Sequence, residues 1–392
     1  MNGFAVLKII KKIVILAVEV CIIAVLVYGV NLFSKINNVS TVEVDEEKVV
    51  VNEDIEEETV ASFTGYTTIA LFGLDNRTSG VYETGNSDVI MIIAINNDTQ
   101  EMNLVSVYRD TFLNTASEEV SFHKANAAYA AGGVEQAISM LNKNLDLDIP
   151  STNYISFDFK AVADVIDIIG GVTINITSEE ELEYLNYYID HTNGILGTDS
   201  PSVSGTGKQK LDGVQAVAYS RIRYTSGGDY RRAQRQRVVL SKMIKKVKKA
   251  SLSELTQILD EVFPEIETGL SQSDLLDMAS VMLKYDMEEM SGFPFDRATK
   301  TIGSKGSVVV PCDLVSNVTE LHKLLYANET YTPSETVQSY SAQITSETGY
   351  TAESAISDDY SESDDLSELN GNSSSSDESS DESSESTDST EY

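Results

Sequence analysis

Six arginines lie within one short stretch of this chain, S-R-I-R-Y-T-S-G-G-D-Y-R-R-A-Q-R-Q-R at positions 220–237. Arg221 and Arg223 belong to the run V-A-Y-S-R-I-R-Y, which is typical of a short extended segment. Alternate residues of such a segment point to one face. Guanidinium groups bind phosphate oxygens through paired hydrogen bonds. The first part of the stretch therefore predicts two arginines directed at one phosphate-bearing ligand.

The second part of the stretch predicts a helix whose first turn faces the same ligand. Asp229 follows the turn T-S-G-G and is expected to cap this helix. Arg232 and Gln236 are four residues apart and share a helical face. A helix N-terminus adds N–H donors and a dipole that favours anions. The predicted site is a pyrophosphate clamp; the alternative is a solvated basic face or attachment to anionic lipid, which the lysines of 242–249 fit.

Charged side chains also lie at the ends of three apolar runs. Asp75 and Arg77 follow I-A-L-F-G-L, Asp88 begins D-V-I-M-I-I-A-I, and Arg109 and Asp110 follow L-V-S-V-Y. In α/β proteins, ligands bind where polar groups end the strands of an apolar sheet. Carboxylates from two neighbouring strands, Asp75 and Asp88, suit Mg²⁺ (or Mn²⁺), which also takes phosphate oxygens. For each residue alone, an Asp–Arg salt bridge or a turn cap is the alternative.

The segments that must position these side chains alternate between strands and helices. Strands are expected over 67–75, 87–96, 102–110, 153–159, 171–176 and 306–311. Helices are expected over 132–145, 160–169, 233–249, 251–263, 271–285 and 318–326. Two of the strands are apolar on both faces, as in a sheet covered by helices on each side. The alternation predicts an α/β fold, a three-layer α-β-α sandwich.

The regions flanking the predicted domain differ from it in composition. The apolar run 13–33 is long enough to span a bilayer core, and lysines precede it. This predicts a transmembrane anchor with residues 1–12 in the cytoplasm and the rest outside; a cleaved signal peptide is the alternative. An acidic spacer is expected over 34–63, the catalytic domain over 64–330, and an acidic, Ser-rich disordered tail over 331–392.

Composition excludes several classes of function. The formal net charge of −34 argues against nucleic-acid binding, although most of the acid excess lies in the two flanks. The two cysteines are far apart in the chain, so no disulfide framework is expected. The three histidines do not cluster, which excludes a zinc site. Neither a Walker loop nor a G-x-S-x-G motif is present.

Taken together, these motifs resemble the LytR–CpsA–Psr (LCP) family. In chain order, the matching segments are G-L-D-N-R (73–77), G-N-S-D-V-I-M (85–91), V-Y-R-D-T (107–111), K-A-N-A-A-Y-A-A-G-G (124–133), I-G-G-V-T-I (169–174), L-D-G-V-Q-A-V-A-Y-S-R-I-R (211–223) and G-G-D-Y-R-R-A-Q-R-Q-R (227–237). Two positions depart from the family pattern. Asn86 replaces an arginine and Tyr108 replaces a proline. Arg77 or Arg235 is expected to supply the phosphate interaction that an arginine in place of Asn86 would make.

The resemblance implies a cell-wall enzyme with an LCP-type sandwich. Such an enzyme moves a glycopolymer, such as teichoic acid or capsular polysaccharide, from a polyprenyl pyrophosphate to peptidoglycan outside a Gram-positive cell. Asp75 and Asp88 would hold Mg²⁺, and Asp229 would orient the arginines or assist the acceptor hydroxyl. The residues that would contact the phosphates are Arg109, Arg221, Arg223, Arg232 and Gln236.

The expected reaction is attack of an acceptor hydroxyl on the phosphorus that carries the glycan. Mg²⁺ and the arginines would stabilise the charge that develops on the leaving polyprenyl phosphate. A carboxylate near the metal, Asp75 by preference, would act as the base. Two other functions fit the same clamp. The first is a polyprenyl-pyrophosphate hydrolase, and the second is a regulator that binds the lipid without turnover.

Overall fold

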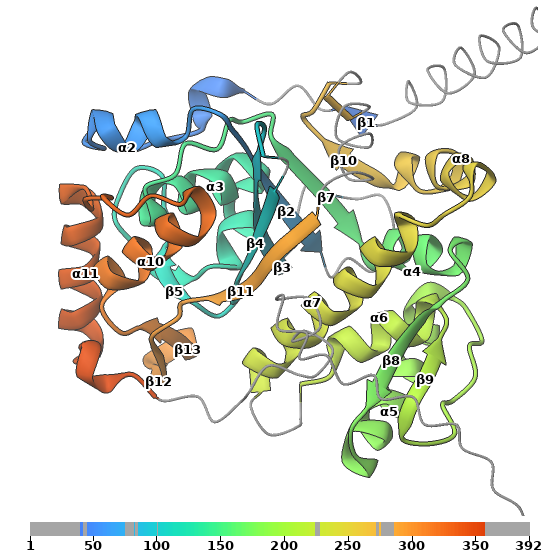
Figure 1. Ribbon diagram of the computed structural model, residues 1–392. Helices are drawn as coiled ribbons and strands as arrows, with labels where there is room; N and C mark the ends of the chain where they lie inside the picture. The colour runs from blue at the N-terminus through green and yellow to red at the C-terminus, as the bar shows by residue number, and fades with distance from the viewer. Residues whose placement is uncertain are drawn as a thin grey trace, which may run out of the picture.

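A computed structural model of the chain describes residues 40–41, 45–74, 82, 85–99, 101–223, 228–271, 274–275 and 286–356 (Figure 1). Within these residues, seven strands form one mixed sheet in the order β1-β10-β7-β2-β3-β4-β11. The bounds are β1 Ser40–Thr41, β2 Tyr66–Leu74, β3 Ser87–Asn96, β4 Glu101–Val107, β7 Tyr154–Asp158, β10 Ile266–Thr268 and β11 Asp286–Phe293. The central strands β2, β3 and β4 are antiparallel, whereas β7 and β11 run parallel to their neighbours β2 and β4.

Helices cover both faces of this sheet, so the expected three-layer sandwich is confirmed. The helices are α2 Glu57–Ser62, α3 Ala127–Leu145, α4 Phe159–Ile168, α5 Glu179–Leu196, α6 Gly213–Arg221, α7 Gly228–Val247, α8 Leu252–Glu261, α10 Leu314–Tyr326 and α11 Glu335–Thr348. Short 3-10 turns lie at Glu46–Lys48, Phe263–Glu265, Gly303–Lys305 and Ala352–Ser354. Among the described residues, three two-stranded antiparallel sheets complete the fold: β5 Phe112–Asn114 with β6 Phe122–Lys124, β8 Val172–Ile176 with β9 Gly207–Leu211, and β12 Arg297–Ile302 with β13 Gly306–Pro311.

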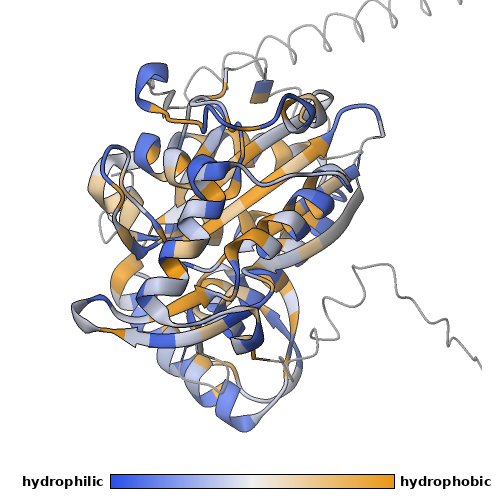
Figure 2. Cartoon of the chain, turned by 90° about the vertical axis from the view of Figure 1, so that its left-hand side faces the viewer, coloured by the Kyte–Doolittle hydropathy of each residue, from blue (hydrophilic) through white to orange (hydrophobic). Residues whose placement is uncertain are grey.

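The apolar strands divide their side chains between two cores. Phe72, Ile90 and Ile92 pack with α3, α10 and α11 on one face. Met91 and Ile93 point to the other face, where they pack with α5, α6, α7 and the two-stranded β8–β9 sheet. This division follows from the two-residue period of a strand. Figure 2 shows the hydrophobic colour along a central strand, flanked by helices of mixed colour.

The folded domain extends further in both directions than the expected range 64–330. The segment before it, expected to be a spacer, contains α2 and packs on the domain, because the Asn52 side chain donates to the Lys143 carbonyl at 2.9 Å. The segment after it contains α11, whose buried Val337 and Ile344 join the first core. The expectation of a disordered tail is therefore wrong for residues 331–356. The apolar residues of this segment recur at helical spacing. Its high content of serine and acidic residues nevertheless led to the prediction of disorder.

Four other expectations have different outcomes. Residues 217–221 of the run 217–224 are helical and not extended, because α6 continues to Arg221 from a capping box between Asp212 and Gln215. The strand near 171–176 exists, but it pairs with β9 outside the main sheet. The helix expected over 271–285 lies mostly outside the described residues, as does the apolar run 13–33. No helix within the described residues is long and apolar enough to cross a membrane.

Candidate functional site

The candidate site is built around Asp88, at the start of β3. Arg109 donates from Nη1 to Asp88 Oδ1 at 2.6 Å. Arg232 approaches the other oxygen, with Nη1 3.8 Å from Oδ2. The Arg232 side chain is only 4% exposed, and those of Arg109 and Asp88 are 13% and 17% exposed. One half-buried carboxylate thus holds two guanidinium groups from distant parts of the chain.

Strand register explains the meeting of Asp88 and Arg109. β3 and β4 are antiparallel, and Met91 lies opposite Ser106. Continuing this register by three residues places Asp88 opposite Arg109, at one edge of the sheet. Leu74, the last residue of β2, pairs with Ser87 at the same edge. Three strand ends therefore converge here, as the sequence predicted.

A second carboxylate and a lysine extend the cluster. Lys124 Nζ lies 3.0 Å from Asp110 Oδ1, and Arg109 Nε lies 3.8 Å from the same oxygen. Asp110 is buried, at 7% exposure. Among the described side chains of this cluster, three cations thus surround two carboxylates, a balance that suits an anion.

An aromatic and arginine stack holds the start of α7 beside the end of β4. The Arg297 guanidinium lies 5.0 Å from the Tyr108 ring and 4.6 Å from the Tyr230 ring. The two rings meet edge to face at 5.1 Å. The Tyr230 hydroxyl also hydrogen-bonds to Thr299 Oγ1 at 2.9 Å. Sequence reasoning missed Arg297, which stands in a polar run without any motif.

Tyr108 stands where the family pattern has a proline, and the structure shows how its larger side chain is accommodated. A Cβ added at Gly292 would lie 2.2 Å from the Tyr108 hydroxyl oxygen and 3.2 Å from Arg237 Nη1. The neighbouring strand β11 therefore needs a glycine at this position to admit the tyrosine ring. The departure is accommodated within the fold, and Arg109 keeps its place after β4.

The remaining predicted phosphate ligands are dispersed. Arg221 ends α6, where Nη1 donates to Thr192 Oγ1 at 3.0 Å and the guanidinium lies 4.6 Å from the Phe159 ring. Arg223 is exposed beyond the helix, and Gln236 is half-buried on α7. Because Arg221 ends a helix and is not in a strand, the expected alternation of Arg221 and Arg223 on one face does not hold.

Arg235 lies in a buried ion pair. Its Nε donates to Glu181 Oε1 at 2.9 Å, and its Nη1 donates to the Ile222 carbonyl at 3.2 Å. Both side chains are under 10% exposed, at 8% and 6%. Arg235 therefore joins α5, α7 and the end of α6, and its guanidinium already has two protein acceptors.

Three other predicted residues have no described side chain. Asp75 and Arg77 lie outside the described residues. Asp229 falls in the first turn of α7, which begins at Gly228 and so includes the residue expected to precede it. Within the described ranges, no group of three His, Cys, Asp or Glu could hold a metal ion. Asp88 fits as one carboxylate ligand of Mg²⁺, which in phosphate sites needs only one or two.

Comparison with known proteins identifies the family of the chain. The model of the LytR_cpsA_psr family matches residues 27–323, which is most of the chain.

The chain belongs to the LytR_cpsA_psr family.

Relatives within this LCP family carry different names. A polyisoprenyl-teichoic acid–peptidoglycan teichoic acid transferase TagU of Enterococcus faecalis is 30% identical over 58% of this chain and 70% of its own length. Biofilm regulatory protein A of Streptococcus mutans is 30% identical over 52% of this chain, and the match spans half of that protein. The crystal structure of TagT of Bacillus subtilis has a TM-score of 0.52 at 20% identity, covering 73% of this chain and 99% of that one. This structural likeness shows a shared LCP fold.

Proposed function

We propose that this protein transfers a glycopolymer, of teichoic acid or capsular type, from a polyprenyl pyrophosphate to peptidoglycan. The observation that carries the proposal is the pair of arginines on Asp88, at the edge of the sheet where ligands bind in α/β folds. The name of the Enterococcus relative supports the same activity. The anchor predicted over 13–33 would hold the domain at the outer surface of the cell membrane, beside its lipid substrate.

The described arginines suit the charge that develops in this reaction. An acceptor hydroxyl oxygen forms a bond to the phosphorus that carries the glycan, and the bond from that phosphorus to the bridging oxygen breaks. The hydroxyl loses its proton to a base, proposed to be Asp75, and polyprenyl phosphate leaves with the bonding electrons. Arg109 and Arg232 would stabilise the leaving phosphate and keep the pyrophosphate oriented.

Asp88 would have two tasks in the proposed site. It holds the two guanidinium groups apart from each other and in fixed directions, so little reorganisation is needed when substrate binds. With Asp75 it would also hold Mg²⁺, which neutralises phosphate charge when bound. Arg221, the last residue of α6, and Arg223, just beyond it, would reach the ligand from the other side of the clamp, with Asp229 and Gln236 on α7.

The test uses the full chain in detergent micelles with Mg²⁺, a polyprenyl-pyrophosphate disaccharide and a soluble peptidoglycan oligomer. Mass spectrometry should find the disaccharide joined to the oligomer by a phosphodiester. Arg109→Ala and Arg232→Ala should each reduce this product by about 10²-fold or more, as removal of a charge-stabilising donor does in other enzymes. Lys305→Ala, which removes a cation paired with Glu347 on the surface, serves as the control.

Two outcomes would contradict the transferase. Polyprenyl phosphate released without the adduct, and absent in the same two arginine variants, would indicate the hydrolase. Lipid binding that depends on Arg109 without any turnover would indicate a regulator, the function that the name of the Streptococcus relative suggests.

A further inference from the structure

A third arginine, Arg297 on β12, contacts the neighbours of both arginines in the site. Its guanidinium lies 5.0 Å from the Tyr108 ring and 4.6 Å from the Tyr230 ring. In the sequence, Arg109 directly follows Tyr108, and Arg232 follows Tyr230 by two residues. One side chain therefore links the end of β4 to the start of α7, beside the two residues that are expected to meet the phosphates.

Backbone acceptors fix the guanidinium of Arg297. Its Nη1 donates to the carbonyls of Pro294 and Phe295, at 3.1 and 2.9 Å. These residues directly precede β12, so the side chain folds back on its own segment. A cation over an aromatic face attracts the ring, and here it faces two rings. Arg297 is therefore a fixed point against which Tyr108 and Tyr230 pack.

Apolar packing joins the same elements. Tyr108, Ala233 and Val309 are buried in one small cluster, and Tyr230 packs against it. Ala233 directly follows Arg232 on α7, and Val309 lies on β13, the partner strand of β12. The stack and the cluster thus form one contact between α7, β4 and the β12–β13 sheet, and a shift of α7 along β4 would disturb both.

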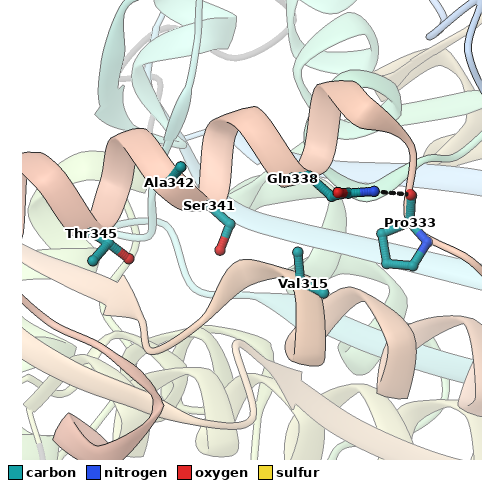
Figure 3. A pocket seen from close by; sticks show the side chains of 6 residues that line it. All are labelled: Val315, Pro333, Gln338, Ser341, Ala342 and Thr345. Carbon is teal, nitrogen blue, oxygen red and sulfur yellow. Dashed lines mark hydrogen bonds between the residues drawn. The ribbon is translucent and has the colours of Figure 1, made fainter.

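The C-terminal segment supports β12, the strand that carries Arg297. The Ile356 N–H donates to the Arg297 carbonyl at 3.0 Å. Before this point, α11 packs against α10, and no charged residue is among the six labelled residues that line the hollow between them (Figure 3). One of the six, Ser341, accepts from the Leu314 N–H at 3.1 Å, which ties α11 to the start of α10. The extension beyond the predicted domain boundary therefore helps to hold Arg297 in place.

The stack depends on a tyrosine at a position where the family pattern has a proline. A proline fixes its own φ and so stiffens the turn that precedes Arg109. Tyr108 lacks that constraint, and its ring instead contacts Arg297 and meets Tyr230 edge to face at 5.1 Å. Three side chains in this chain thus supply the rigidity that one proline would supply.

We propose that Arg297 is a positioning residue that sets the spacing of Arg109 and Arg232, and so gives the site a preference for pyrophosphate over a single phosphate. Two guanidinium groups at a fixed spacing can bind both phosphates of one ligand with little further loss of conformational freedom. A single phosphate needs only one of them. Arg297 acts through Tyr108 and Tyr230 and does not touch the ligand. The identity of the ligand as a pyrophosphate rests on the proposed function.

The experiment compares two inorganic anions without turnover. Isothermal titration calorimetry of the full chain in neutral detergent micelles, without Mg²⁺, gives the affinity for pyrophosphate, and displacement of pyrophosphate gives the affinity for phosphate. In Arg297→Met, pyrophosphate should bind about tenfold more weakly and phosphate less than about twofold more weakly, because only pyrophosphate needs both arginines at their spacing. Arg297→Lys keeps a cation over the rings and should lose no more than about threefold for pyrophosphate. The stoichiometry of each titration gives the folded, binding-competent fraction.

Lys300→Met on the same strand is the matched control. The Lys300 ammonium lies 5.1 Å from the Tyr350 ring, a cation–π pair that includes neither Tyr108 nor Tyr230. This variant should keep the parent affinity for both anions. An equal loss in Lys300→Met would overturn the proposal, because β12 would then act only through its general stability.

Two further outcomes separate this inference from the proposed function. Equal weakening of both anions in Arg297→Met would make Arg297 a phosphate ligand and overturn its positioning role. A preference for pyrophosphate that survives Arg297→Met would overturn this inference alone. A parent protein without that preference would overturn the proposed clamp, and this inference with it.

Discussion

Asp88 sets the electrostatics of the arginine site, because each of its oxygens faces a different guanidinium group. The variant Asp88→Asn keeps the side-chain shape and removes the negative charge. Arg109 and Arg232 then lack their shared counter-charge, so inorganic pyrophosphate should bind more tightly when Mg²⁺ is absent. If Asp88 is also a ligand of Mg²⁺, the variant should lose the effect of Mg²⁺ on this binding.

Isothermal titration calorimetry with and without Mg²⁺ measures both effects, and the exposed Asp148→Asn is the matched control. Transfer should fall by about 10²-fold in Asp88→Asn, because the arginines are no longer held in position. If Asp88→Asn bound pyrophosphate as tightly as the parent protein, with an unchanged response to Mg²⁺, Asp88 would not be part of the site.

At the scale of elements, the buried pair of Glu181 and Arg235 joins α5 to α7. Glu181 also accepts hydrogen bonds from the backbone and the hydroxyl of Thr177, at 2.8 and 2.9 Å. Glu181→Gln leaves the Arg235 charge buried without its partner charge. This should lower the free energy of unfolding by about 3–5 kcal/mol. Urea denaturation followed by circular dichroism measures the loss.

The surface pair of Lys323 and Glu329 gives the control for this prediction. Its atoms are 3.5 Å apart and its side chains are 50% and 71% exposed. Glu329→Gln should therefore change the free energy of unfolding by less than about 1 kcal/mol. If both variants lost the same small free energy of unfolding, the Glu181–Arg235 pair would stabilise the fold no more than a surface ion pair does.

Sequence reasoning succeeded where one element decides the outcome. Continuous apolar runs indicate the strands beside Asp88 and Arg109, and antiparallel register then brings these two residues together. Sequence reasoning failed for features that depend on contacts between residues far apart in the sequence. Arg235 resembles Arg232 in the sequence, yet its partner Glu181 lies 54 residues away. Likewise, α6 contains two valines and leads into the alternating Arg221 and Arg223, but its cap at Asp212 and its burial on several sides make it a helix.

At the scale of the whole molecule, His322 links stability to pH. It is fully buried on α10, its Nε2 contacts the Leu145 carbonyl at 2.8 Å, and its ring stacks on Tyr331 at 3.8 Å. Burial lowers the pKa of His322 to about 4, although the negative charge of the nearby Asp146 acts to raise it. The unfolded chain takes up this proton near pH 6.5, whereas the folded protein resists it. Stability is therefore lost as the pH falls from about 6.5 towards 4.

This contribution should amount to about 2–3 kcal/mol at pH 4.5. His322→Gln removes the titrating group, so the difference in unfolding free energy between pH 7.5 and pH 4.5 should shrink by that amount. The exposed His191→Gln should leave the difference unchanged. Chemical denaturation at the two pH values provides the measurement, and an equal pH response in wild type and His322→Gln would refute the assignment.

Asp146 has a consequence for how the domain carries mechanical load. This buried carboxylate accepts hydrogen bonds from Asn52, Tyr331 and Ser334, at 2.6 to 2.8 Å, so the chain that enters the domain and the chain that leaves its core are tied at one point. Upstream of this point, Val50 bonds to Ser139, so the entering segment runs along α3 towards its C-terminal end. A tension applied to residues 45–49 would load these bonds side by side in shear. The entering segment would then resist the pull as one unit.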